Sequence, residues 1–260
     1  MSLRRIRALV FRYTVLYTRS VPRILEMIFW PVMDLLVWGF LTAYLRPQLS
    51  TVTFLLGAMI FWDIIYRSAQ GVTMSFLEDV WTRNLLNVFV APLRVGEFIA
   101  ASFLVGFLKI TFIVIILSVM ALGLYQFNLL SMGLALIPFF ANLLLMGWAI
   151  GMVTTALILR WGQAAEGLAW GIPFAVQPLA AVFYPVSILP AWAQPFSLAI
   201  PATHVFEGMR QVLLDGTVSA EHLAAAFGLN LVWLAAAAFF FRHMFNAARE
   251  KGLLVKLATQ

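Results

Sequence analysis

Cysteine is absent from this chain, and its three histidines lie far apart in the sequence. These absences exclude disulfides and thiolate metal sites, and they leave no histidines at metal-ligand spacing. Lysine is also scarce: Lys109, Lys251 and Lys256 do not follow a glycine, so the G-x-x-x-x-G-K-[ST] motif of a nucleotide site is missing. The G-x-S-x-G and H-E-x-x-H motifs of hydrolases are missing too. We therefore expect no catalytic residues, no metal site and no cofactor bound by this chain.

Charged residues are also few in this chain. Charged residues make up 11% of the 260 residues and hydrophobic residues 63%, with a mean hydropathy of +0.95. An ordinary soluble domain has about 25% charged residues, so this chain cannot cover itself with a solvated surface. Its 23 phenylalanines and 9 tryptophans suit lipid-facing surfaces and interfacial belts. We expect a single all-α integral membrane domain over residues 1–260.

Apolar stretches long enough to cross a membrane occur six times. A helix that crosses the ~30 Å hydrocarbon core needs about 20 apolar residues. The six expected spans are 24–45, 50–68, 98–123, 129–159, 164–185 and 223–243.

The basic residues predict the orientation of these spans. Under the six-span arrangement, 14 of the 17 lysines and arginines fall on one side. Only Arg46 and Arg210 fall on the other side, and Lys109 lies inside the third span. Cytoplasmic segments carry the excess of Lys and Arg. We therefore expect a multi-pass protein of a bacterial inner membrane with both termini in the cytoplasm. The net charge of +6 then reflects topology, and no nucleic-acid partner is expected.

A long uncharged stretch follows the start of the fifth span. Residues 167–203 contain no charge but six prolines, and as one helix they would extend ~55 Å, too far for one crossing. Since proline does not suit a continuous helix, we expect a full span followed by re-entrant short helices over 186–205. The alternative is a hydrophobic loop on the outer surface.

The segment 76–90, by contrast, is charged. Apolar residues recur at helical spacing over 76–88, and the opposite face holds Glu78, Asp79 and Arg83. Asp79 and Arg83 have the i,i+4 spacing of a pair worth about 0.3 kcal/mol, and Pro92 ends the helix. Periodicity predicts a short amphipathic cytoplasmic helix, and the alternative is a helix resting at the lipid headgroups.

Several segments, in this order, resemble those of the type-2 ATP-binding-cassette (ABC) export permeases. They are a basic amphipathic segment at 1–22, a first span with WPVMDLLVWGFLTAYL, the cytoplasmic segment ending in NVFVAPLR, and the block VFYPVSILPAWAQPFSLAIPATHVFEGMRQVLLDG. The likeness covers essentially the whole chain. It implies a dimer of six-span permeases, each with an N-terminal interface helix. It also implies two copies of a separate ABC ATPase that bind the ATP and Mg²⁺.

The resemblance further implies roles for individual residues. Two cytoplasmic segments contact the ATPase; their expected residues are Glu78, Asp79, Val80, Trp81, Arg83, Asn84, Leu85, Asn87, Val88, Arg160 and Gln163. The first and fifth spans line the substrate path, with the candidates Trp30, Asp34, Trp38, Tyr44, Phe174, Gln177 and Tyr184. The outer gate would comprise Pro190, Trp192, Pro195, Glu207 and Arg210. Glu207 and Arg210 are three residues apart, and we expect them to pair on the outer face.

Three charged residues within spans have alternative interpretations. Asp34 should face protein or water, because a charge at mid-bilayer is costly. It either lies in the path or at the dimer seam, or it forms a hydrogen bond with a neighbouring helix. Asp63 is expected to pair with Arg67 one turn away. Lys109 either snorkels or pairs with an acid, and a structural role is favoured for it.

The leading hypothesis is the membrane half of an ATP-driven exporter of an amphipathic, lipid-like, glycan-bearing or drug substrate. The alternatives are an ion-gradient transporter that uses Asp34 and Asp63, and a membrane assembly scaffold. Internal inverted repeats of secondary transporters are not apparent in the sequence.

Overall fold

The computed structural model describes residues 2–45, 49–84, 87–88 and 91–251, apart from the side chains of residues 45, 49–53 and 163. The regular structure in these ranges is helical, which confirms the expected all-α fold. The elements are α1 (Leu3–Thr18), α2 (Val21–Leu45), α3 (Leu49–Trp81), α5 (Val95–Tyr125), η1 (Leu129–Ala135), α6 (Leu136–Trp161), η2 (Gly162–Ala165), α7 (Leu168–Val176), η3 (Val186–Ile188), α8 (Gln194–Leu198), α9 (Pro201–Asp215) and α10 (Ala220–Glu250).

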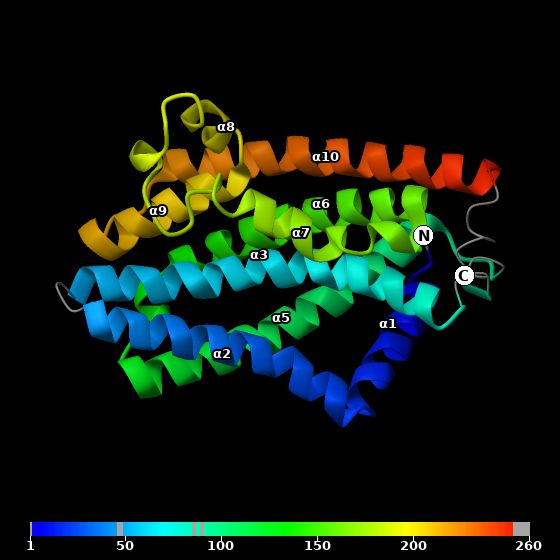
Figure 1. Cartoon of the computed structure of the whole chain (residues 1–260), viewed down its shortest axis with the longest axis horizontal. Coiled ribbons are helices and arrows are strands. Elements are labelled where there is room, and N and C mark those ends of the chain that lie inside the picture. Colours follow the sequence, from blue (N-terminus) through cyan, green and yellow to red (C-terminus); the bar gives the residue numbers. More distant parts are fainter. Residues whose placement is uncertain (1, 46–48, 85–86, 89–90, 252–260) are drawn as a thin grey trace.

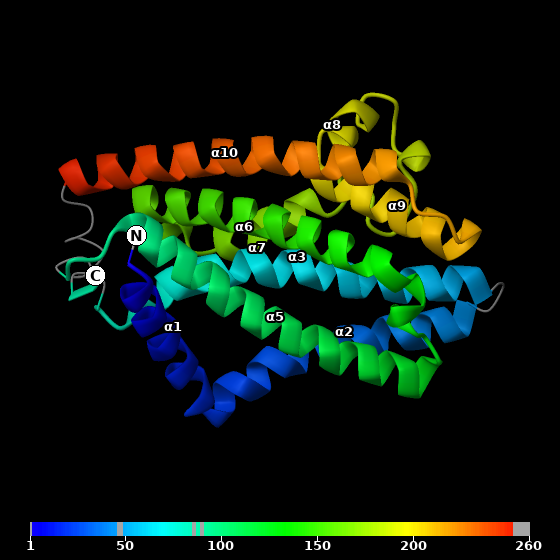
Figure 2. The ribbon, with the colours of Figure 1, turned by 180° about the vertical axis from the view of Figure 1, so that it is seen from behind.

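The long helices form an elongated bundle with two distinct ends (Figures 1 and 2). The start of α1 and the end of α10 lie at one end, together with the α3–α5 and α6–α7 connections. The α5–η1 and α9–α10 connections lie at the opposite end. Segments that the charge count assigns to the cytoplasm therefore share one end of the bundle.

Four helices in the described ranges are long and apolar enough to cross a membrane. Three of them correspond to the expected first, third and sixth spans: Val21–Tyr44, Val95–Tyr125 and Ala220–Glu250. The fourth, Leu129–Trp161, includes η1 and corresponds to the expected fourth span.

The expected second span lies inside α3, which occupies the centre of the bundle. α3 contacts α2, α5, α6, α7 and α9, and most of its residues from Phe54 to Val80 are buried. Its charged residues Asp63 and Arg67 therefore lie inside protein. The helix extends beyond the predicted span and continues to Trp81.

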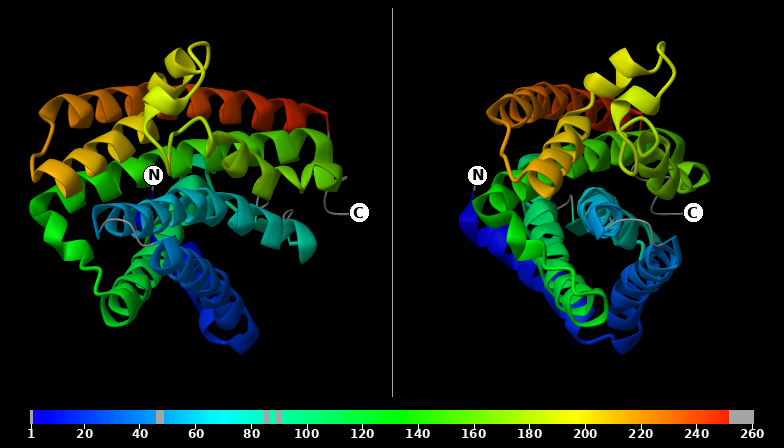
Figure 3. Two further views of the ribbon diagram at one scale, coloured as in Figure 1. Left: turned by 60° about the vertical axis from the view of Figure 1, so that its left-hand side comes forward. Right: turned by 90° about the vertical axis from the view of Figure 1, so that its left-hand side faces the viewer.

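The expected fifth span at 164–185 is not one helix. α7 covers only Leu168–Val176, about 13 Å at 1.5 Å per residue, which is less than half of the hydrocarbon core. Turns follow α7, and Ala181 has φ 50, a left-handed conformation in which a helix cannot continue. The described part of the chain therefore does not show six full helical spans. The short helices predicted after this segment are present as η3 and α8, which project from the side of the bundle (Figure 3).

Glycines allow α3 to approach its neighbours closely. A Cβ atom on Gly151 of α6 would lie 2.6 Å from the carbonyl oxygen of Ala69, and one on Gly147 would lie 2.6 Å from that of Ile65. These two glycines are four residues apart, the small-xxx-small spacing that lets membrane helices pack backbone to backbone. Any larger side chain at either position would push α3 and α6 apart.

Candidate functional site: the polar end of the bundle

Buried acidic residues tie the end of α3 to α1 and to the first turn of α2. Asp79, which is fully buried, forms an ion pair with Arg12 and accepts a hydrogen bond from the Tyr13 hydroxyl at 2.6 Å. Glu78 forms a second ion pair with Arg23. Burial and the negative charge of Asp79 both raise the pKa of Tyr13, so its hydroxyl remains a hydrogen-bond donor at neutral pH.

These contacts correct the predicted helix at 76–90. Residues 76–81 are the last turns of α3, and Arg83 has φ 53, so the helical spacing that predicts an Asp79–Arg83 pair ends before Arg83. Asn87 and Val88 have helical backbone. Residues 85–86 and 89–90 lie outside the described residues, and the prediction for Leu85 falls there.

The expected ATPase-contact residues separate into buried and accessible groups. Those buried within this chain are Glu78, Asp79, Val80 and Val88. Those exposed at the polar end are Trp81, Arg83, Asn87 and Arg160, with Asn84 half-buried. The side chain of Gln163 is not described. The buried group holds the end of α3 in place, whereas the exposed group lies on the surface of the polar end.

The two predicted ATPase contacts lie next to each other in space. The Trp81 indole N–H donates to Glu166 Oε2 at 3.2 Å, which joins the end of α3 to the α6–α7 connection. Behind this contact, the Gln70 amide donates to the carbonyl oxygen of Ala169 at 2.7 Å. Sequence reasoning missed Glu166, because its partner is 85 residues away.

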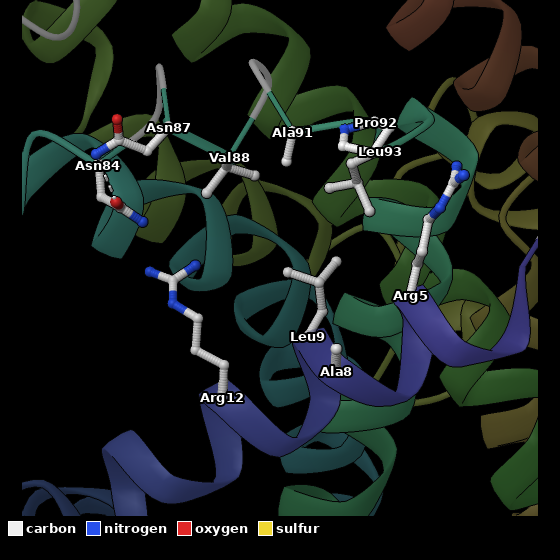
Figure 4. Close-up of a pocket in the computed structure, with 10 residues that line it drawn as sticks. All are labelled: Arg5, Ala8, Leu9, Arg12, Asn84, Asn87, Val88, Ala91, Pro92 and Leu93. Atoms are coloured by element: carbon white, nitrogen blue, oxygen red, sulfur yellow. Dashed lines mark hydrogen bonds between the residues drawn. The ribbon is translucent and has the colours of Figure 1, made fainter.

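A groove of about 460 Å³ separates α1 from the α3–α5 connection (Figure 4). One wall comes from α1 and the other from the connection; the lining residues are Arg5, Ala8, Leu9, Arg12, Asn84, Asn87, Val88, Ala91, Pro92 and Leu93. Outside this lining, Glu97 joins the two walls, since it accepts hydrogen bonds from the backbone N–H groups of Ser2 at 2.6 Å and Arg94 at 2.9 Å. The groove thus has an apolar floor and basic edges.

Two of the charged residues within spans make direct contacts, and one of these contacts is the predicted Asp63–Arg67 pair. Arg67 donates through Nε to both carboxylate oxygens of Asp63, at 2.9 and 2.8 Å. Lys109 Nζ lies 3.2 Å from the centroid of the Tyr17 ring, a cation–π contact that joins α5 to α1. The lysine thus reaches toward the polar end, in agreement with the structural role favoured for it.

The predicted path residues lie along one side of the bundle. Trp30, Asp34 and Tyr44 form an exposed stripe on α2, because they recur at helical spacing. Trp38 stacks on Phe183, in the turn that follows α7. The other predicted residues, Phe174, Gln177 and Tyr184, belong to α7 and this same turn. The Tyr184 hydroxyl donates to the carbonyl oxygen of Pro178 at 2.7 Å, which closes the turn.

The predicted outer-gate pair is present but is largely buried. Arg210 and Glu207 are 2.8 Å apart. Arg210 also donates to the carbonyl oxygens of Ala181 at 2.7 Å and Tyr184 at 2.6 Å, while Glu207 accepts from the N–H of Val186 at 2.8 Å. The pair therefore fixes the turn after α7 onto α9.

The other three predicted gate residues belong to the projecting segment. The carbonyl oxygen of Pro190 accepts from the N–H of Ala193 at 2.8 Å, Pro195 lies in the first turn of α8, and Trp192 is 70% exposed.

Comparison with known proteins relates this bundle to a transporter. The chain matches no protein-family model. It is 25% identical over 196 residues to ABC transporter G family member 20 of Dictyostelium discoideum, and this match covers 74% of the chain. The same match covers 26% of that relative, so the chain spans about a quarter of its length. This distant relationship confirms the predicted resemblance to ABC transporters.

Proposed function

We propose that this chain is the membrane permease of an ATP-driven exporter and that it works with a separate ABC ATPase. The observation that carries the proposal is the relationship to an ABC transporter over 196 residues in a chain whose sequence has no nucleotide-binding motif. ATP and Mg²⁺ would be bound by two copies of the partner ATPase. Two copies of this chain would form the membrane part, in a bacterial inner membrane with both termini in the cytoplasm.

The polar end of the bundle is the proposed ATPase-docking surface. Its exposed residues Trp81, Arg83, Asn87 and Arg160 would contact the partner. The buried Asp79 would hold the end of α3 against α1, so that movement of the ATPase is passed to the helices instead of being lost in a loose loop. The substrate would pass along the side lined by α2 and α7. The substrate would be an amphipathic, lipid-like, glycan-bearing or drug molecule.

Reconstitution with the cognate ATPase tests this proposal. We expect the combined variant Trp81→Ala, Arg83→Ala and Asn87→Ala to lose co-purification of the ATPase and substrate-stimulated ATP hydrolysis. A matched control replaces three exposed residues at the opposite end of the bundle, Leu130, Asp215 and Val218, by alanine. The control should retain both properties.

Two results would contradict the proposal. Transport without any ATPase, abolished by an ionophore, would favour the ion-gradient alternative. An assembled complex in which no substrate is moved and none stimulates hydrolysis would favour the scaffold alternative.

A further inference from the structure

Aromatic rings gather on the side of the bundle formed by α2, α3 and α7. Phe174 of α7 lies 5.2 Å from the ring of Tyr66 and 6.1 Å from that of Trp62, measured between centroids. The ring of Trp38 stacks on Phe183 at 4.4 Å. Phe174 is half exposed, and Tyr66 and Trp38 are partly exposed. An incoming molecule could therefore reach these rings from outside the bundle.

A carboxylate borders these rings. Asp34 is exposed and lies one helical turn before Trp38 on α2. It makes no hydrogen bond or ion pair with the described residues, and its interaction with Arg67 acts only at longer range. Arg67 is already committed to Asp63 through two hydrogen bonds. Since Arg67 neutralises Asp63, the carboxylate of Asp34 leaves one net negative charge on this side of the bundle.

The position of Asp34 requires a polar environment. It lies near the middle of the span Val21–Tyr44, where a carboxylate facing lipid is costly. A cation satisfies both features of this surface, because the carboxylate attracts it directly and the faces of the aromatic rings attract it through their quadrupoles. An anion of the same shape would be repelled by the carboxylate.

We propose that the surface formed by Asp34, Trp38, Tyr66 and Phe174 binds the cationic group of an amphipathic substrate, with Asp34 as its counter-ion. This inference rests on the proposed export function, and it narrows the substrate class to molecules that carry a positive charge beside an apolar body. The other candidate occupant of this surface is a second copy of the chain, which would cover Asp34.

Two ions of nearly equal size and shape but opposite charge provide the test. The purified chain in detergent, without the ATPase, is equilibrated with radiolabelled tetraphenylphosphonium or tetraphenylborate, and bound ligand is measured by equilibrium dialysis. We expect saturable binding of the cation only. Asp34→Asn should weaken this binding about tenfold, equivalent to about 1.4 kcal/mol. Phe174→Leu, which keeps apolar bulk but removes the ring, should weaken it about threefold.

The matched control is Glu26→Gln, which removes an exposed carboxylate two turns earlier on the same helix and should leave binding unchanged. Equal binding of both ions, or an Asp34→Asn variant that binds the cation as well as the wild type, would overturn the proposal. So would a wild type that binds neither ion while Asp34→Asn changes the oligomeric mass, because Asp34 would then be covered by a second copy. Since the ATPase takes no part, failure of ATP-driven transport would refute the exporter but not this site.

Discussion

Replacing Asp79 by alanine should loosen the attachment of α1 to the end of α3. The Tyr13 hydroxyl is fully buried and donates to Asp79 at 2.6 Å; losing a charged acceptor costs about 1.5–3 kcal/mol. The carbonyl oxygen of Ser75, 3.3 Å from the same hydroxyl, offers a weaker replacement and favours the lower half of that range. Arg12 keeps 34% of its side chain exposed, so it becomes hydrated when released, and its ion pair adds at most about 1 kcal/mol. We expect α1 to be held about 2–3 kcal/mol less firmly.

Amide hydrogen exchange of residues 3–18 measures this change directly, because exchange reports the free energy of local opening. A loss of 2–3 kcal/mol corresponds to exchange that is about 30- to 150-fold faster. Peptides from α10 should exchange as in the wild type. The control Asp215→Ala, which removes an exposed carboxylate at the other end of the bundle, should leave α1 unchanged. If α1 in a folded Asp79→Ala variant exchanged within about threefold of the wild-type rate, the argument that Asp79 anchors it would be refuted.

Three further changes test the packing of the bundle. Gly151→Leu should force α3 and α6 apart and lower the free energy of unfolding by at least about 1–3 kcal/mol, measured as a lower thermal midpoint. The control Gly228→Leu should have little effect, because nothing lies within 4 Å of a Cβ added there. Equal effects of the two substitutions would contradict the close crossing of α3 and α6. Arg210→Met should leave the charge of the mostly buried Glu207 without a partner and lower the free energy of unfolding by about 3 kcal/mol, which limited proteolysis would detect as faster cleavage after α7. Adding Glu207→Gln should restore part of this stability. A double variant that is no more stable than Arg210→Met would argue against the ion pair. Asn230→Ala removes two hydrogen bonds between α10 and α6, from the Asn230 amide to the backbone carbonyl oxygen of Asn142 at 3.0 Å and to its side-chain oxygen at 2.9 Å. At about 0.6 kcal/mol per bond, the variant should lose about 1.2 kcal/mol in thermal unfolding. A loss below about 0.3 kcal/mol would show that these bonds do not hold the two helices together.

Contacts between residues one helical turn apart could be predicted from the sequence. The Asp63–Arg67 and Glu207–Arg210 pairs are of this kind, because the helix alone brings their side chains together. The all-α fold and the four apolar spans likewise follow from composition and length. The burial of the Glu207–Arg210 pair was harder to predict. Arg210 is buried because it donates to two carbonyl oxygens more than 20 residues away in the sequence.

Contacts between distant segments could not be predicted in this way. Asp79 pairs with Arg12, 67 residues earlier, and no local rule chooses that arginine over Arg83. The continuation of α3 to Trp81 was not predicted, because Glu78 and Asp79 suggest a separate solvated helix when they are considered without their partners. The fifth span was overestimated for the opposite reason. Its residues are apolar, but the backbone turns at Ala181.

The continuity of α3 has a mechanical consequence. No break separates Asp63, in the middle of the bundle, from Trp81 at the polar end, a distance of about 27 Å along the helix. A helix of this length behaves as a nearly straight rod, so a tilt of about 5° applied at Trp81 would displace Asp63 by about 2 Å. The first point at which the backbone can absorb such a movement is the left-handed Arg83, beyond the end of the rod. We therefore expect a movement imposed on the near side of Arg83 to be carried along α3 to the aromatic rings of Trp62 and Tyr66.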